Sequence, residues 1–375
     1  MFDLLFDPGN FIVWILIVSI IIGAVAVISR PFASFVQFAY PNAKYEAIGN
    51  PYIKKSNCEK ISESETLDQF IDQLNTQKDY QIQASTTSEI QARLDDHFIA
   101  MIDQMKQDHG KKMKAFFDAY IDFTHTWMIK EVIRDIHQHT EIDTESLIST
   151  STSEMVTRFL KEITATTDEE VNAVLSSYGF DASFIDLIGK EDTISIQLDS
   201  GIDQFFIKKM NQVSVPYKCQ QAKHEYISRL IDIISTKHIL RAKQMKYHEK
   251  LCQLFVIGEG YEIPTWKFNE LCKADSVKDV VDILDGTSYH PFLKKAMDHY
   301  ESSSSVQPLL TSLDEAMLDM VRQISQQYYV SIGPSIRFMV SKQIEITNLK
   351  IISKGIAEHI KKDLITSLLI TEADL

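Results

Sequence analysis

Glycine and proline are scarce in this sequence. Only 12 Gly and 9 Pro occur among 375 residues, and Ile, Leu, Lys, Glu, Gln and Asp fill the long stretches between them. So few turn-forming residues exclude a sheet protein with many tight turns and favour helices. The apolar fraction of 45% is enough for a buried core at this length, which excludes a mainly disordered chain. The sequence therefore predicts an all-α fold.

Cysteine is scarce as well. The four cysteines, Cys58, Cys219, Cys252 and Cys272, lie 161, 33 and 20 residues apart. None of these spacings gives the close pair of thiolates that builds a zinc site. Free thiols in a reducing compartment are expected.

Basic residues are outnumbered by acidic ones. The chain has 38 Lys and Arg against 52 Asp and Glu, which gives a net charge of −14 with His neutral. A general affinity of the main part of the chain for nucleic acid or anionic lipid is therefore not expected. Lysine pairs such as Lys111–Lys112 are too short and too interspersed with acids for a nucleic-acid track. An acidic body suits a basic protein partner better.

Motifs for catalysis and cofactor binding are missing from the sequence. No G-x-x-x-x-G-K-[ST] loop occurs, so no phosphate cradle of that kind can form. His137 and His139 are two residues apart and point to different sides of a helix, which does not suit metal binding. The adjacent acids Asp95 and Asp96 diverge by about 100° on a helix, which favours a solvated face over acid–base work. We expect a protein that is not an enzyme and that holds no cofactor or metal.

One long apolar run stands near the N-terminus. Residues 11–29 read FIVWILIVSIIIGAVAVIS, without a charge, and at about 1.5 Å rise per residue they approach the thickness of a bilayer core. The sequence therefore predicts a transmembrane helix at residues 11–29, in contact with membrane lipid. Its marker residues are Phe11, Trp14, Ile20, Gly23 and Ser29. A cleaved signal peptide is the alternative, although no basic stretch precedes the run.

Charges on either side of this run predict its orientation. Asp3 and Asp7 precede it, whereas Arg30 follows at once and Lys44 comes next. Cytoplasmic flanks of transmembrane helices carry the excess of Lys and Arg. We therefore expect a single-pass protein of the cell membrane with the bulk of the chain on the cytoplasmic side.

Two short patterns each recur three times along the rest of the chain. The first is Leu-Asp with an apolar residue four positions before the Leu, so that both apolar residues share one helical face. The second is an acid followed by one or two apolar residues and a polar residue at the third position. The signature positions of both patterns are Leu94, Asp95, Asp122, Leu198, Asp199, Asp232, Leu313, Asp314, Glu345 and Asn348.

The spacing of the two patterns repeats along with their order. Consecutive acids of the second pattern are 110 and 113 residues apart, and the gaps from the first pattern to the second are 27, 33 and 31 residues. Patterns in step at a fixed period indicate a repeated supersecondary unit. A Ser/Thr-rich stretch at 149–153 and a Gly-Glu-Gly turn at 258–260 divide the units. We expect an N-terminal anchor at 1–39 and helical repeats at 40–150, 151–257 and 258–375, named predicted repeats 1, 2 and 3.

The last third of the chain carries a resemblance to a known family. Its segments 260–264 (GYEIP), 284–289 (LDGTSY), 333–338 (GPSIRF) and 342–352 (KQIEITNLKII) resemble the C subunit of the archaeal A-type ATP synthases, which is related to the d subunit of the vacuolar ATPase. Residues 67–80 and 120–133 match more loosely, and His125, Thr126 and Trp127 depart from the family pattern. The resemblance covers about residues 40–375.

The resemblance implies a fold and a role. The fold is a funnel of three similar helical domains related by pseudo-threefold symmetry, here beside one N-terminal transmembrane helix. The role is that of a non-catalytic rotor subunit of the central stalk. It seats on the membrane ring of ion-carrying proteolipid subunits, receives the central shaft, and transmits torque for proton- or sodium-driven ATP synthesis or ATP-driven ion transport.

Two alternatives stay open at this point. Many relatives begin directly with the helical body, so the transmembrane helix is a departure, and we expect it in the lumen of the ring or as an assembly anchor elsewhere. A different class of function is a single-pass membrane adaptor that holds a helical scaffold for signalling partners. Stoichiometry distinguishes that adaptor from a rotor subunit.

Overall fold

The computed structural model describes residues 11–140, 144–165 and 170–372, apart from the side chains at positions 12, 28–35, 144, 146 and 149. Every regular element in these ranges is a helix, beside an isolated β-bridge between Lys54 and Glu372. The all-α prediction is confirmed. The elements are α1 (Phe11–Ile48), η1 (Pro51–Ile53), α2 (Lys55–Ile61), α3 (Leu67–Asn75), α4 (Thr87–His109), α5 (Lys111–Thr124), α6 (Thr126–Gln138), α7 (Thr144–Thr150), α8 (Glu154–Thr164), α9 (Val171–Tyr178), α10 (Ala182–Ile188), α11 (Ser195–Gln212), η2 (Tyr217–Cys219), α12 (Gln220–Gln244), α13 (Glu249–Gln253), α14 (Thr265–Lys273), α15 (Val277–Ile283), α16 (His290–Ser303), α17 (Gln307–Gln327), α18 (Gly333–Ala357) and α19 (Lys362–Ser367).

Local sequence signals decide where the helices of predicted repeat 1 begin and end. Thr86 caps α4, because its hydroxyl accepts the N–H of Glu89 while the Glu89 carboxylate accepts the N–H of Thr86. Gly110 ends α4 with a φ of 75°, a region that favours glycine, and α5 begins at the next residue. His125 leaves the helical conformation with a ψ of 8°, which separates α5 from α6.

The long helices pack in a closed order. Within each predicted repeat two of them are neighbours: α4 with α5, α11 with α12, and α17 with α18. Between repeats, α5 and α6 pack on α11, α12 packs on α17, and α18 packs back on α4. The contacts between long helices therefore run from predicted repeat 1 through repeats 2 and 3 and back to repeat 1. The predicted boundaries of the repeats, and their arrangement as a threefold funnel, stay predictions.

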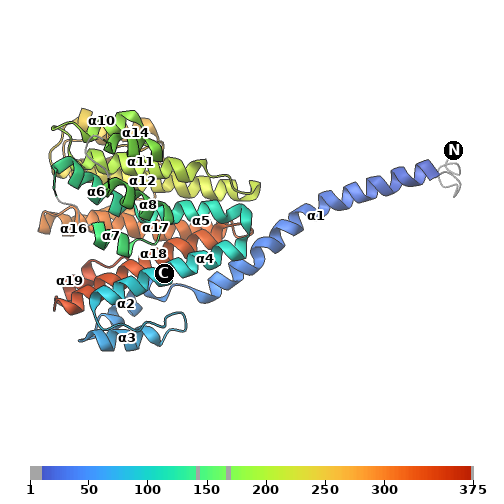
Figure 1. Cartoon of the computed structure of the whole chain (residues 1–375), viewed down its shortest axis with the longest axis horizontal. Helices are drawn as coiled ribbons and strands as arrows, with labels where there is room; N and C mark the ends of the chain where they lie inside the picture. The colour runs from blue at the N-terminus through green and yellow to red at the C-terminus, as the bar shows by residue number, and fades with distance from the viewer. Residues whose placement is uncertain (1–10, 141–143, 166–169, 373–375) are drawn as a thin grey trace.

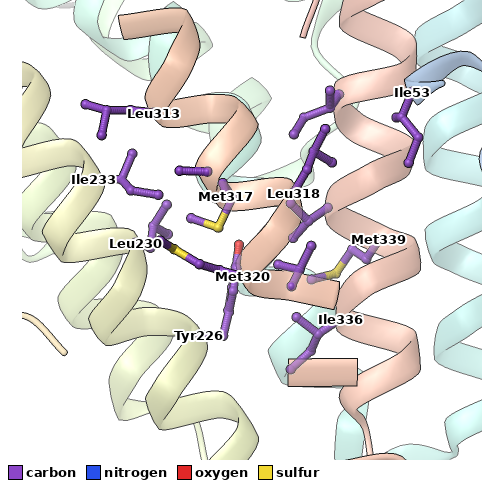
Figure 2. Packing of buried hydrophobic residues seen from close by; sticks show 14 of the residues in the cluster. Ile53, Tyr226, Leu230, Ile233, Leu313, Met317, Leu318, Met320, Ile336 and Met339 are labelled. Carbon is purple, nitrogen blue, oxygen red and sulfur yellow. The ribbon is translucent and has the colours of Figure 1, made fainter. Parts of the chain in front are cut away.

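Two clusters of buried apolar side chains form the core. The larger extends from α1 to α5 and from the end of α11 to α19, and the smaller lies among α6 to α11. Figure 2 shows the larger cluster where Met317 and Met320 of α17 lie between Leu230 of α12 and Ile336 of α18. Burying a side chain of this size contributes about 1.5–3 kcal/mol. This core therefore binds helices of all three predicted repeats to one another.

Helix α1 projects from one end of the body (Figure 1). Its C-terminal part packs on the body, where Phe38 and Tyr45 are buried. Its N-terminal part stands clear: Phe11 is 75% exposed and Ile20 is 62% exposed, although both are large apolar residues. A single helix thus joins a packed segment to a segment whose apolar side chains are exposed among the described residues.

The prediction of a transmembrane helix at residues 11–29 is not supported. Among the residues that the structure describes, no helix is both long enough and apolar enough to span a bilayer. Ser29 is one of the residues whose side chain lies outside the description.

Candidate functional site

The three signature leucines lie in the core. Leu94, Leu198 and Leu313 are fully buried, Leu198 in the smaller cluster and the other two in the larger one. Ile90 and Leu309, four positions before two of them, are buried too, as expected for residues on one face of a helix. These positions therefore serve packing.

The three aspartates that follow these leucines form ion pairs with a neighbouring predicted repeat. The pairs are Lys350 with Asp95 (2.6 Å between nitrogen and oxygen), Arg134 with Asp199 (3.8 Å) and Lys237 with Asp314 (2.6 Å). The aspartates lie on α4, α11 and α17, the first long helix of each predicted repeat. Each base lies on a later helix of the preceding repeat, with repeat 1 following repeat 3.

Glu345 of α18 holds the start of predicted repeat 1. The side chain is buried, and its Oε2 accepts the backbone N–H of Tyr52 at 2.9 Å. Its Oε1 accepts the hydroxyl of Tyr80 and the ammonium of Lys342, the latter at 2.7 Å. Three residues on, Asn348 donates to the backbone carbonyl of Tyr52 at 3.0 Å. One carboxylate and one amide thus fix both backbone groups of Tyr52.

Asp232 of α12 holds the loop that leads into predicted repeat 3. Its buried carboxylate accepts the backbone N–H groups of residues 261–263 at 2.9–3.1 Å and the hydroxyl of Tyr289 at 2.7 Å. Three residues on, the hydroxyl of Ser235 accepts the N–H of Ile257 at 3.2 Å. The loop before α14 is therefore shaped by one helix of the preceding repeat.

Asp122 of α5 holds the start of predicted repeat 2. Its carboxylate accepts the hydroxyl of Ser153, the residue that caps α8, at 2.7 Å, and the ammonium of Lys209 at 2.9 Å. Three residues on, Nε2 of His125 accepts the N–H of Thr152 at 3.3 Å. The acid and the third residue after it again bind one segment.

The second pattern thus repeats in its contacts as well as in its letters. In each copy, the acid and the residue three positions on bind the segment at the boundary with the next predicted repeat. We name these places the 1–2, 2–3 and 3–1 junctions, after the repeat that holds and the repeat that is held. The partners at the junctions were missed by the sequence reasoning, because backbone N–H groups leave no side-chain pattern.

Charge is balanced differently at the 3–1 and 2–3 junctions. At the 3–1 junction, the buried ammonium of Lys342 lies 2.7 Å from both Glu345 and Asp79. Burial alone would raise the pKa of Asp79, but its contacts with His97 and Lys342 lower that pKa to about 2. At the 2–3 junction, burial raises the pKa of Asp232 to about 6, against the hydrogen bonds that favour its ionised form.

All four cysteines are buried free thiols. Cys58 lies at the 3–1 junction, where its thiol donates to the carbonyl of Tyr52 at 2.9 Å. Burial, together with the charge of Glu345, raises the pKa of Cys58 to about 12, so this thiol is unreactive in the closed structure. Within the described residues, no group of three or more His, Cys, Asp or Glu is placed to hold a metal ion.

The marker residues of the apolar run are not gathered into a site. Phe11, Trp14, Ile20 and Gly23 follow one another along the exposed part of α1, whereas the side chain of Ser29 lies outside the described residues. What they share is exposure of apolar surface, which few single proteins leave uncovered over such a length.

The packed end of α1 lies against a buried histidine of α4. Nδ1 of His109 donates to the carbonyl of Met105 at 2.8 Å, and its Nε2 lies 2.7 Å from the hydroxyl of Ser335 on α18. The rings of Phe38 and Tyr45 from α1 lie against this imidazole. Burial lowers the pKa of His109 to about 4, so the ring is neutral near pH 7.

Known proteins match most of this chain. The family model of the ATP synthase (C/AC39) subunit matches residues 41–368. The chain belongs to this family. A protein from Methanosphaera stadtmanae, named as the C subunit of an A-type ATP synthase, is 25% identical, over 93% of this chain and 92% of the relative. The protein of the same name from Methanothermobacter thermautotrophicus is also 25% identical, over 92% and 91%, and that from Methanocaldococcus jannaschii is 30% identical over 47% and 44%.

As a member of the C/AC39 family, the chain is a subunit of an ATP synthase complex and not an enzyme by itself. The resemblance found in residues 40–375 is thereby confirmed. All ten signature positions lie inside the matched range 41–368. The exposed part of α1 lies outside it.

Proposed function

We propose that this member of the C/AC39 family is a rotor coupling subunit in the central stalk of a rotary A-type ATP synthase. It links the membrane ring of ion-carrying proteolipid subunits to the central shaft. It transmits torque for proton- or sodium-driven ATP synthesis, or for ATP-driven ion transport. The observation that carries this role is the closed order of long helices, in which every predicted repeat is bonded to the next.

A torque-transmitting body needs stiffness between its two contact surfaces and no reactive group. Stiffness is supported by bonds at all three junctions, because hydrogen bonds to ionised groups are roughly twice as strong as neutral ones. Glu345, Asp232 and Asp122 each make several of them. Force applied to one predicted repeat therefore reaches the other two through packed and bonded helices.

The exposed part of α1 supports a place at the membrane. Its apolar side chains point to all sides of the helix and not to one face, which is typical of a helix surrounded by apolar material. We propose that residues 11–29 contact lipid in the lumen of the proteolipid ring. The bulk of the chain then lies on the cytoplasmic side of the cell membrane, consistent with Arg30 and Lys44 following the apolar run.

Purification of the full-length chain from its native membrane in mild detergent tests this role. We expect proteolipid ring and shaft subunits to co-purify, with one copy of this chain per ring. A photocrosslinking residue at position 14 should reach a proteolipid subunit, whereas one at Trp127, an exposed residue of the body, should not. Recovery without any ATP synthase subunit would reject the proposed role and favour the membrane adaptor.

A further inference from the structure

At the 3–1 junction, the two bonded groups lie much farther apart in the chain than at the other two junctions. Asp122 and Ser153 are 31 residues apart in the chain, and so are Asp232 and Ile263. Glu345 and the N–H that it binds are 293 residues apart. The entropy cost of holding two points together grows with the length of chain between them. The bonds at the 3–1 junction therefore close a longer loop, at a higher entropy cost, than the bonds at the other two junctions.

The segment held there has little structure of its own. We name residues 49–61 the strap: it contains η1 and α2. η1 has three residues, with Tyr52 outside helical geometry, and α2 has seven. Helices of this length are unstable in isolation. The order of the strap thus depends on its contacts with the rest of the chain.

The strap and the C-terminal segment meet at the same place on α18. Asn348 binds the carbonyl of Tyr52 and also exchanges two hydrogen bonds with the backbone of Ile370, at 2.7 and 2.9 Å. The N–H of Glu372 donates to the carbonyl of Ile53 at 2.8 Å. The strap is therefore pressed between α18 and the C-terminal segment, with no other helix of predicted repeat 1 needed for these bonds.

We propose that Glu345 and Asn348 form a clasp from which the strap detaches as a unit, while α18 stays packed on α4 and the other two junctions stay shut. The clasp does not depend on the proposed role in torque transmission.

Cys58 reports the state of the clasp directly. Its thiol is 1% exposed and bonded to Tyr52 inside the strap, and Nδ2 of Asn348 lies 3.8 Å from its sulfur. A thiol reagent can reach it only when the strap leaves α18. Cys252 and Cys272 are equally buried, but they lie beside α12, away from the strap. They report opening of the body as a whole.

The test is thiol labelling of the full-length protein under native conditions, with each cysteine quantified by mass spectrometry. We expect Cys58 to react at least tenfold faster than Cys252 and Cys272, at a rate that low urea hardly changes, as for local opening. Glu345→Gln should speed the labelling of Cys58 at least a further tenfold and change the labelling rates of Cys252 and Cys272 less than twofold. Asp122→Asn, the matched change at the 1–2 junction, should leave Cys58 within twofold.

A milder pair of variants covers the case in which Glu345→Gln fails to fold. Asn348→Ala keeps the carboxylate of Glu345 and removes the hydrogen bonds to Tyr52 and Ile370, and Ser235→Ala removes the hydrogen bond to Ile257 at the matched position of the 2–3 junction. Only Asn348→Ala should speed the labelling of Cys58, by a few-fold. One common rate for the three cysteines in wild type and variants would overturn the clasp, and so would equal acceleration of Cys58 by Ser235→Ala.

Discussion

The 3–1 and 1–2 junctions use the same two helix positions in different surroundings. Glu345 meets Lys342, whose side chain is fully buried, whereas Asp122 meets Lys209, whose side chain is 39% exposed. A buried charge that loses its partner stays uncompensated, while an exposed pair is weakened by water and salt. The buried ion pair thus stands at the junction whose bonded groups lie farthest apart in the chain. One sequence pattern therefore marks contacts in different surroundings.

Replacement of Glu345 should lower the free energy of unfolding most, and it tests the difference between the 3–1 and 1–2 junctions. Glu345→Ala leaves Lys342 buried with Asp79 alone and the N–H of Tyr52 without an acceptor. We expect the free energy of unfolding to fall by about 3–5 kcal/mol. Asp122→Ala should lower it by about 1–2 kcal/mol, as for loss of part-buried hydrogen bonds. Urea titrations followed by circular dichroism measure both, and equal losses would show that the two junctions do not differ.

Protonation of His109, beside the packed end of α1, should lower the stability of the fold by an intermediate amount. His109 has a pKa lowered to about 4 in the folded chain, against an ordinary value of 6.5 for histidine. A base with a lowered folded pKa contributes stability above pH 6.5 and loses it as the pH falls toward 4. This loss amounts to about 3 kcal/mol.

A glutamine at this position tests that loss, because it keeps hydrogen-bonding groups and does not titrate. Between pH 6.5 and 4, His109→Gln should lose about 3 kcal/mol less stability than wild type. His299→Gln, which removes an exposed histidine, should behave as wild type does. Unfolding midpoints recorded at several pH values decide this, and parallel curves for all three proteins would contradict it.

Loss of the exposed lysine at the 1–2 junction should give the smallest effect. Lys209→Ala removes one ammonium from Asp122, which keeps its hydrogen bond from Ser153. We expect a change of about 0–1 kcal/mol that vanishes in high salt. Thermal unfolding with and without 1 M NaCl measures it. A loss as large as that of Glu345→Ala would break the contrast between the two junctions.

The signature positions show how far sequence patterns reach. Their spacing predicted that the copies of each pattern occupy equivalent places. In the structure Asp232 and Glu345, two copies of the same position, both accept backbone N–H groups. The sequence did not show which contacts these positions make. Leu-Asp was interpreted as a helix face, yet Asp95 and Asp314 each bind a lysine from a helix far along the chain. Partners such as Tyr52 carry no motif, because a backbone N–H belongs to any residue.

The apolar run has a distinctive sequence pattern, but the structural prediction drawn from it is not supported. Its letters at 11–29 are distinctive, and they predicted a bilayer span that the described structure does not support. What the structure adds is that the same helix continues to Ile48 and that its far end is built into the body around His109. A hydropathy pattern ends where the apolar letters end, whereas a helix continues as long as its backbone bonds do.

By itself the sequence determined the all-α class, the family and the positions that recur, because periodicity, composition and motif spacing are local properties of the chain. Only the tertiary structure decided that α18 packs back on α4 and that Glu345 holds Tyr52. Contacts between residues 293 positions apart depend on how all the intervening helices pack, and no local pattern contains that information.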